Sequence, residues 1–307
     1  MNIKYLPLIN TTNRRVSLIE KNKFEDKLDL VRSSYKNHSH FFLSNWNNEG
    51  FFSSSDKSVY LKILKFFSIF NFGVHKIFNK AKIGSIGNVA IFPISSQYNY
   101  RWISRSVKYL AKKIIVKNFD TEIKNILADD AYEIDQILFH NTSSKNSNIN
   151  FKYSSEDDIK ADHINFYHVD TTPPSVIKVM IYLSTIVDEN NGAFRYIPYS
   201  YKKNTSYDDW CIRHVVRNNY FNTDKETMRK FYSLPKKYQK RNTFTYLLDD
   251  TNYKKQIDKS AIVFKTPCNI ILFNPMGIHS GGFIYKGQRK ALQITIKGKS
   301  IKQKHDK

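Results

Sequence analysis

The chain of 307 residues contains only two cysteines, Cys211 and Cys268, which lie far apart and form no C-x-x-C pair. Two cysteines are too few for the disulfide framework of a small secreted protein. The first 15 residues also lack the continuous apolar run that a secretion signal requires. We therefore expect a protein of a reducing compartment, the cytoplasm.

A long uninterrupted hydrophobic run is missing as well. The most apolar long segment, residues 60–78, is interrupted by Lys62, Lys65 and Asn71. A membrane-spanning helix needs about 20 consecutive, predominantly apolar residues. We therefore expect no transmembrane segment and interpret residues 60–78 as a core helix or, as the alternative, a helix at a membrane surface.

Acidic residues are scarce beside basic ones, with 27 Asp and Glu against 49 Lys and Arg and a net charge of +22. Such a charge is typical of proteins that bind nucleic acid or anionic membranes. The sequence has no arginine-rich block, zinc-finger spacing or glycine-rich phosphate loop, however. Its richness in Lys, Asn and Ile is also what an AT-rich genome produces. We therefore do not expect nucleic acid as the partner, and the charge mildly favours an anionic or carrier-linked small molecule.

The pattern of apolar residues indicates one domain over residues 1–307, built from successive parts. Residues 1–55 are polar and are expected to be irregular, whereas residues 56–150 are expected to be mainly helical support. A polar and aromatic stretch at 201–258, with a helix expected at 224–234, interrupts the later part as an insertion. The final residues, 299–307, form a basic tail.

Helical spacing is clearest at residues 104–119, where apolar residues recur every three or four positions. Asp120 or Thr121 then suits the N-cap of a second helix. Residues 140–150 have the composition of a loop.

From about residue 160 to 298 the apolar period changes to two, which is typical of strands. The turn at Asn191-Gly192 suits a backbone with positive φ. Strands are expected within residues 175–186, 194–200, 261–266, 269–275 and 291–298. Helices followed by strands predict an α+β fold whose β part is a sandwich or a barrel.

A histidine and a carboxylate stand two positions apart in HINFYHVDTT, residues 163–172. On a strand, His168 and Asp170 would point to the same face. The pair is therefore either a polar pair facing solvent or part of a metal site. A third ligand is available in His279, which follows a buried strand and a turn. Two histidines and one carboxylate, with positions left open, form the facial triad of non-haem Fe(II) enzymes.

The other histidines suit a metal site less well. Four lie in polar stretches and are expected to be exposed to solvent: His38, His40, His140 and His305. Three lie in the apolar helical run, in the insertion, or on the opposite face of the strand: His75, His214 and His163.

Arg289 follows His279 by ten residues, on or just before a strand. In an antiparallel pair this offset spans a turn and brings the arginine back near the metal. A buried arginine needs a partner, and a guanidinium binds a carboxylate through two parallel hydrogen bonds. Iron at one end and Arg289 at the other would suit a five-carbon keto-diacid.

At this point the residues resemble a known family, the phytanoyl-CoA dioxygenase-like branch of the Fe(II)/2-oxoglutarate oxygenases. The similarity covers about residues 160–298 and includes KVMIYLSTIVDENNGAFRYIPYSY and ILFNPMGIHSGG. The resemblance implies a double-stranded β-helix, the cupin-like jelly roll, with flanking N-terminal helices. It also implies His168, Asp170 and His279 as iron ligands and Arg289 as the anchor of 2-oxoglutarate. Asn165 and Ser280 are weaker candidates for contacting this co-substrate, with ordinary strand and turn hydrogen bonds as the alternative.

The activity implied is hydroxylation of an aliphatic C–H bond with O2, releasing succinate and CO2. Related halogenases lack the carboxylate ligand, so Asp170 favours hydroxylation, although desaturation and cyclisation stay open. The substrate is expected to be a small molecule, a lipid or a sugar-type compound. Two alternatives are a basic protein that binds nucleic acid or a membrane surface, and a cupin-type metal protein that does not use 2-oxoglutarate. The insertion at 201–258 is either a lid over the substrate or a peripheral helical pair with its own small core, and the oligomeric state is not readable.

Overall fold

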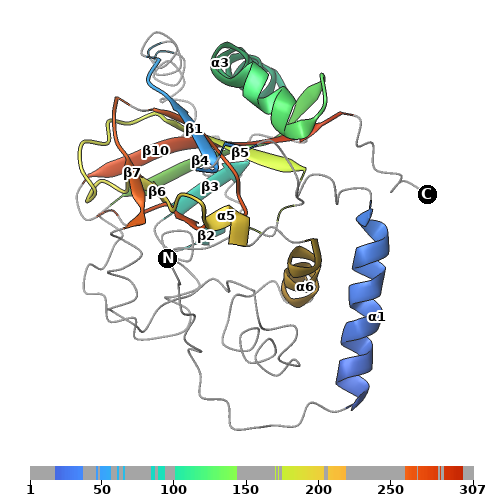
Figure 1. Cartoon of the computed structure of the whole chain (residues 1–307). Coiled ribbons are helices and arrows are strands. Elements are labelled where there is room, and N and C mark those ends of the chain that lie inside the picture. Colours follow the sequence, from blue (N-terminus) through green and yellow to red (C-terminus); the bar gives the residue numbers. More distant parts are fainter. Residues whose placement is uncertain are drawn as a thin grey trace.

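The structure is a computed structural model, and its core consists of two antiparallel sheets with helices packed around them (Figure 1). It describes residues 18–36, 46–47, 49–56, 61, 65, 84–86, 89–93, 101–143, 170, 172, 175–203, 207–218, 260–267, 269–282, 284 and 287–299. The expected helices at 60–78 and 224–234, together with His75, lie outside these residues or almost entirely so.

The larger sheet has seven strands in the order β1-β8-β5-β10-β4-β3-β2, and all its pairs are antiparallel. Its strands are β1 (Phe51–Ser54), β2 (Gly84–Ile86), β3 (Val89–Pro93), β4 (Tyr132–Ser143), β5 (Val176–Tyr182), β8 (Ile270–Phe273) and β10 (Gln288–Gly298). The smaller sheet has the order β7-β6-β9. Its strands are β6 (Phe194–Tyr196), β7 (Ile262–Phe264) and β9 (His279–Ser280). The strands expected from alternation at 175–186, 261–266, 269–275 and 291–298 are thus confirmed. The strand expected at 194–200 is confirmed only over Phe194–Tyr196, because a short helix begins at Ser200.

Both faces of the larger sheet are covered, and the pleat decides which residues face which side. Ile177, Val179 and Ile181 of β5 pack against helix α3 (Arg101–Leu127), and we call this side the outer face. Met180 and Tyr182 pack instead with the smaller sheet, and we call that side the inner face. Because β5 is covered on both sides, all seven of its residues are buried.

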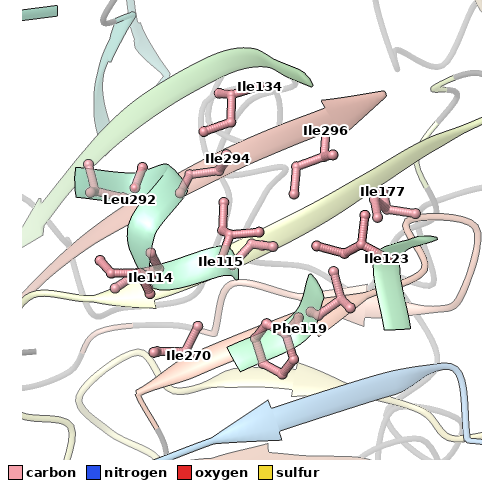
Figure 2. Close-up of a cluster of buried hydrophobic side chains, with 14 of the residues drawn as sticks. Ile114, Ile115, Phe119, Ile123, Ile134, Ile177, Ile270, Leu292, Ile294 and Ile296 are labelled. Carbon is pink, nitrogen blue, oxygen red and sulfur yellow. The ribbon is translucent and has the colours of Figure 1, made fainter. Parts of the chain in front are cut away.

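The outer face is held by aliphatic packing. Ile114, Ile115 and Ile123 of α3 lie fully buried against the sheet, as Figure 2 shows. Burying one such side chain contributes about 1.5–3 kcal/mol. The backbone of α3 leaves helical geometry at Phe119, where two helices join at a kink. This kink lies next to the boundary that the sequence predicts at Asp120 or Thr121.

The inner core is aromatic. Phe194 of the smaller sheet contacts Phe273 of the larger one at a ring-centroid distance of 4.7 Å. Phe264 of the smaller sheet also contacts Phe51 of the larger one, edge to face, at a ring-centroid distance of 5.0 Å. The Tyr182 hydroxyl donates to the Phe264 carbonyl and accepts from the Phe194 amide, so it joins the two sheets. The two sheets are therefore packed face to face.

The expectation that residues 1–55 are irregular is wrong for two segments. Residues Leu18–Ser34 form helix α1, and Phe51–Ser54 form β1 at one edge of the larger sheet. Asp26, Lys27 and Asp29 of this helix are exposed. Phe24, Leu28 and Val31 share the spacing of one helical face and pack in a common cluster. A stripe this narrow among so many polar residues is easily overlooked in the sequence.

The expectation that residues 56–150 are mainly helical overlooks several strands, although the long helix α3 does lie in this range. Strands β2, β3 and β4 lie in this region and belong to the larger sheet, so the β core does not begin at residue 160. The loop expected at 140–150 starts too early, because β4 continues to Ser143. A bulge near Asp135, where Gln136 and Ile134 pair with consecutive residues of β10, breaks the alternation and conceals the strand.

Helix α6 (Tyr207–Asn218) pairs with α1 rather than with the two sheets, and Figure 1 shows the two helices side by side. Trp210 and Cys211 of α6 are fully buried with Leu28 of α1. A short helix, α5 (Ser200–Lys203), follows β6. None of the helices described has both the length and the apolar character needed to cross a membrane.

Candidate metal and carboxylate-binding site

Asp170 and His279, far apart in the sequence, lie together at the inner face. The Asp170 Oδ2 atom is 3.3 Å from His279 Nε2, and both side chains are largely buried. The Asp170 amide donates to the Pro275 carbonyl at 2.8 Å, which ties its segment to the turn before His279. Two ligand candidates predicted from the sequence are therefore brought into direct contact.

The imidazole of His279 is held in a defined orientation. In the β6–β9 pair His279 stands opposite Tyr196, so both face the inner core. The His279 Nδ1 atom lies 2.8 Å from the Gly277 carbonyl oxygen. Because a carbonyl only accepts, Nδ1 carries a proton, and the lone pair of the neutral ring is on Nε2. Nε2, the atom that would bind a metal, thus faces Asp170.

The spacing of these two atoms fits a shared metal ion. Two donor atoms bound at about 2.1 Å and at a right angle are about 3.0 Å apart. The observed 3.3 Å between Asp170 and His279 is close to that separation. Within the described residues, no group of three or more His, Cys, Asp and Glu lies together. The predicted third ligand, His168, and the candidate Asn165 lie outside the described residues, so their roles stay predictions.

Lys178 is a site residue that the sequence analysis missed. It stands in the middle of β5, and its Nζ atom is 2.7 Å from Asp170 Oδ2. Only 11% of its side chain is exposed. The signal in the sequence is a single charge within the apolar run VIKVMIY, where a charge that is buried needs a partner.

Arg289 lies at the start of β10 and is 3% exposed. Its guanidinium donates to the Gly192 carbonyl at 2.7 Å, while its Nε–H, also buried, has no hydrogen-bond partner among the described residues. Burial lowers the pKa of Arg289 below its ordinary value, yet an arginine stays charged in proteins. A buried cation with an unused donor suits an anionic ligand.

The predicted turn at Asn191-Gly192 positions this arginine. Gly192 has φ +76°, which confirms the positive φ expected there. A side chain at this position would meet Ile284 at 2.5 Å. Because Gly192 has no side chain, the turn can lie close to Ile284 and to Arg289. The Gly192 carbonyl can then accept the hydrogen bond from Arg289.

His140 is buried, so the expectation that it is exposed to solvent is wrong. It stands on β4 opposite Ala291, two strand positions along from the pair of Thr142 with Arg289 and therefore on the same face. Its Nε2 atom has no partner among the described residues. Burial, helped by the charges of Arg289 and Lys178, lowers the pKa of His140 to about 3, so the ring is neutral. The polar composition after residue 140 concealed a strand that carries this side chain to the inner face.

Ser280 is not brought together with the metal ligand candidates. In the β6–β9 register it stands opposite Arg195, next to His279 along the strand and hence on the other face. Its hydroxyl accepts from the Gly282 amide at 3.0 Å. The sequence analysis gave such a turn hydrogen bond as the alternative to contact between Ser280 and the co-substrate.

Helix α6, which lies in the insertion at 201–258, contacts the segments that carry the site, and it packs with Met276, three residues before His279. The Trp210 indole donates to the Thr172 carbonyl at 2.9 Å, two residues beyond Asp170. Trp210 itself is fully buried. The described part of the insertion therefore supports the segment that carries Asp170, and the lid stays a prediction for its other residues.

Comparison with known proteins finds distant similarity to solved structures. HygX from Streptomyces hygroscopicus, with nickel and 2-oxoglutarate bound, is 9% identical with a TM-score of 0.44, covering 82% of this chain and 84% of that one. EctD from S. alaskensis, with 2-oxoglutarate and 5-hydroxyectoine, is 10% identical with a TM-score of 0.46, covering 98% and 83%. SnoN, a non-heme alpha-ketoglutarate-dependent epimerase from nogalamycin biosynthesis, is 8% identical with a TM-score of 0.41, covering 89% and 84%.

No family model and no curated protein matches the sequence. Similarity as distant as that to the solved structures carries no conclusion about activity. The chemistry of the site therefore has to be argued from the residues of this chain.

Proposed function

We propose that this protein is an Fe(II)- and 2-oxoglutarate-dependent dioxygenase of the phytanoyl-CoA dioxygenase-like type, with a jelly-roll core. One observation carries the proposal: Asp170 Oδ2 and His279 Nε2 lie 3.3 Å apart in a largely buried position. The two facing antiparallel sheets are the arrangement that a double-stranded β-helix requires. Asp170 and His279 would supply two of the three iron ligands, and His168 is proposed as the third.

The roles of the residues follow from their chemistry. His168, Asp170 and His279 would hold the iron, and Arg289 would bind the far carboxylate of 2-oxoglutarate through its unused Nε–H. When bound, iron and 2-oxoglutarate would supply, with O2, the chemistry that oxidises a C–H bond, with succinate and CO2 as the co-products. Gly277 fixes the tautomer of His279 through its carbonyl, and the packed rings of Phe194 and Phe273 exclude water from it.

Hydroxylation is the reaction that we propose, because Asp170 occupies the position that halogenases leave free for halide. The substrate proposed is a small molecule, a lipid or a sugar-type compound, and the charge of +22 favours an anionic or carrier-linked one. The buried thiol of Cys211 is consistent with a reducing cytoplasm.

The alternatives are disfavoured by the same site. A cupin-type metal protein without 2-oxoglutarate would have no use for the buried guanidinium of Arg289, whose Nε–H has no partner in the described part of the chain. A protein that only binds nucleic acid or membranes would not need a carboxylate and an imidazole buried together. Binding of polyanions that weakens steeply with salt and needs no metal would favour that second alternative.

The decisive experiment is an anaerobic titration with Fe(II) and 2-oxoglutarate, followed by exposure to air and measurement of succinate. His279→Ala and His168→Ala are expected to abolish iron binding. Arg289→Ala is expected to weaken 2-oxoglutarate binding by more than tenfold, because it removes a charged carboxylate contact, with little change for iron.

Arg195→Ala is the matched control, since this arginine stands on β6 and pairs with the exposed Glu189. It should leave both affinities unchanged, and circular dichroism should show each variant folded. Iron binding that survives in both histidine variants would rule out the site. A screen of metabolites for a mass gain of one oxygen atom would then identify the substrate.

A further inference from the structure

Lys178 introduces a positive charge where a divalent metal is proposed to bind. Its Nζ atom contacts Asp170 Oδ2 at 2.7 Å, and the same oxygen is the one that faces His279 Nε2 at 3.3 Å. The lysine comes from β5, a strand buried along its whole length, so its ammonium group has little access to water. In the metal-free protein, the oxygen needed by the metal is therefore already paired.

The balance of charges at the site is unfavourable for a metal ion alone. Lys178 neutralises Asp170, and Arg289 adds a further positive charge on the same face. His140 is neutral there. Asp170, Lys178 and Arg289 together thus carry a net charge of about +1. A divalent cation binds best where the surrounding charge is negative. In a site of low effective dielectric the repulsion is only weakly screened.

We propose that Lys178 holds Asp170 in the metal-free protein and makes binding of the divalent metal depend on the dianionic co-substrate. The two negative charges of 2-oxoglutarate offset the two positive charges of the metal ion. Binding of both therefore leaves the net charge of the site unchanged, whereas binding of the metal or of 2-oxoglutarate alone changes that charge by two. Binding of one therefore strengthens binding of the other, and the effect is reciprocal. This inference rests on the proposed function.

A merely supporting role for Lys178 predicts the opposite result. Partners that only orient a metal ligand strengthen metal binding, and their loss weakens it by about 10- to 100-fold. A cation that competes with the metal for Asp170 does the reverse, because its removal frees the carboxylate. The sign of the change in metal affinity therefore distinguishes the two roles.

The experiment is calorimetric titration of the full chain with Mn(II), with and without saturating 2-oxoglutarate. For the wild type, 2-oxoglutarate should tighten Mn(II) binding by a factor of about 5 to 150, the usual range of coupling between two sites. Lys178→Met should bind Mn(II) alone at least about fivefold more tightly, and the effect of 2-oxoglutarate should shrink accordingly. Lys178→Arg, which keeps the charge, should retain most of the coupling.

Lys297→Met is the matched control, since Lys297 is also paired with carboxylates but stands at the far end of β10. It should bind Mn(II) as the wild type does. Lys178→Gln provides a second neutral variant should Lys178→Met fail to fold. Unchanged or weaker Mn(II) binding in the folded neutral variant would overturn the inference. Asp170→Asn separates failure of the inference on Lys178 from failure of the proposed metal site. If Asp170→Asn also leaves Mn(II) binding unchanged, the proposed metal site itself is wrong.

Discussion

The two faces of the larger sheet are made from the same strands but differ in chemistry. The outer face meets α3 through aliphatic side chains such as Ile177, Ile294 and Ile115, as Figure 2 shows. The inner face carries Lys178 and Arg289, two buried cations, between aromatic side chains. Alternation along a strand thus places the aliphatic packing on one side and the proposed site on the other.

The difference shows where this fold tolerates unpaired polar groups. Buried polar atoms normally have partners, and on the outer face the Ser54 hydroxyl donates to Asn118 and the Tyr132 hydroxyl to Asp120 of α3. On the inner face, Arg289 Nε and His140 Nε2 lack partners among the described residues. Such groups are unfavourable for folding, so their presence on the inner face supports the proposal that a ligand binds there.

The largest expected effect on stability comes from the outer face. Ile294→Ala leaves a cavity under α3 and is expected to lower the free energy of unfolding by about 2–5 kcal/mol, because Ile294 is fully buried. Urea denaturation would measure the loss. Gln293→Ala, one position along β10, is the control and should lose clearly less. Equal losses at the two positions would contradict the division of roles between the faces.

A smaller effect is expected at His140 on the inner face, and it depends on pH. The unfolded chain protonates this histidine near pH 6.5, whereas the folded protein keeps it neutral until about pH 3. The unfolded state therefore binds more protons in this window, and stability falls as the pH is lowered through it. From pH 8 to pH 5 the loss from this group is about 2 kcal/mol.

Urea denaturation at both pH values, for the wild type and His140→Gln, would isolate this contribution. The variant should lose less stability on acidification. His214→Gln is the control, because His214 is less buried, although burial also lowers its pKa. Parallel losses in the wild type and His140→Gln would show that His140 is accessible to protons in the folded state.

The smallest effect on stability is expected at the exposed ion pairs of Lys297, at the end of β10. Lys297 pairs with Asp135 at 2.8 Å and with Glu133 at 3.3 Å, and all three side chains are partly exposed. Exposed ion pairs contribute less than about 1 kcal/mol, so Lys297→Met should change the urea midpoint only slightly. A loss as large as that of Ile294→Ala would mean that burial does not explain the contrast between the faces.

Much of the β architecture was predictable because its signal is local. Alternation identified β5, β6, β7, β8 and the main part of β10, and Asn191-Gly192 identified a turn with positive φ. The same method failed for β4, where a bulge breaks the period. It also failed for α1, whose apolar stripe becomes visible only once α6 covers it.

The sequence by itself determined the residue types of the proposed site, since H-x-D, a later histidine and an arginine ten residues on can be seen without coordinates. Their roles as iron ligands and co-substrate anchor stay predictions. Only the tertiary structure decided which charges surround Asp170. The contacts of Lys178, His140 and Arg289 depend on strand pairing and on which face each side chain takes. Such contacts join residues that are distant in the chain, and no local pattern records them.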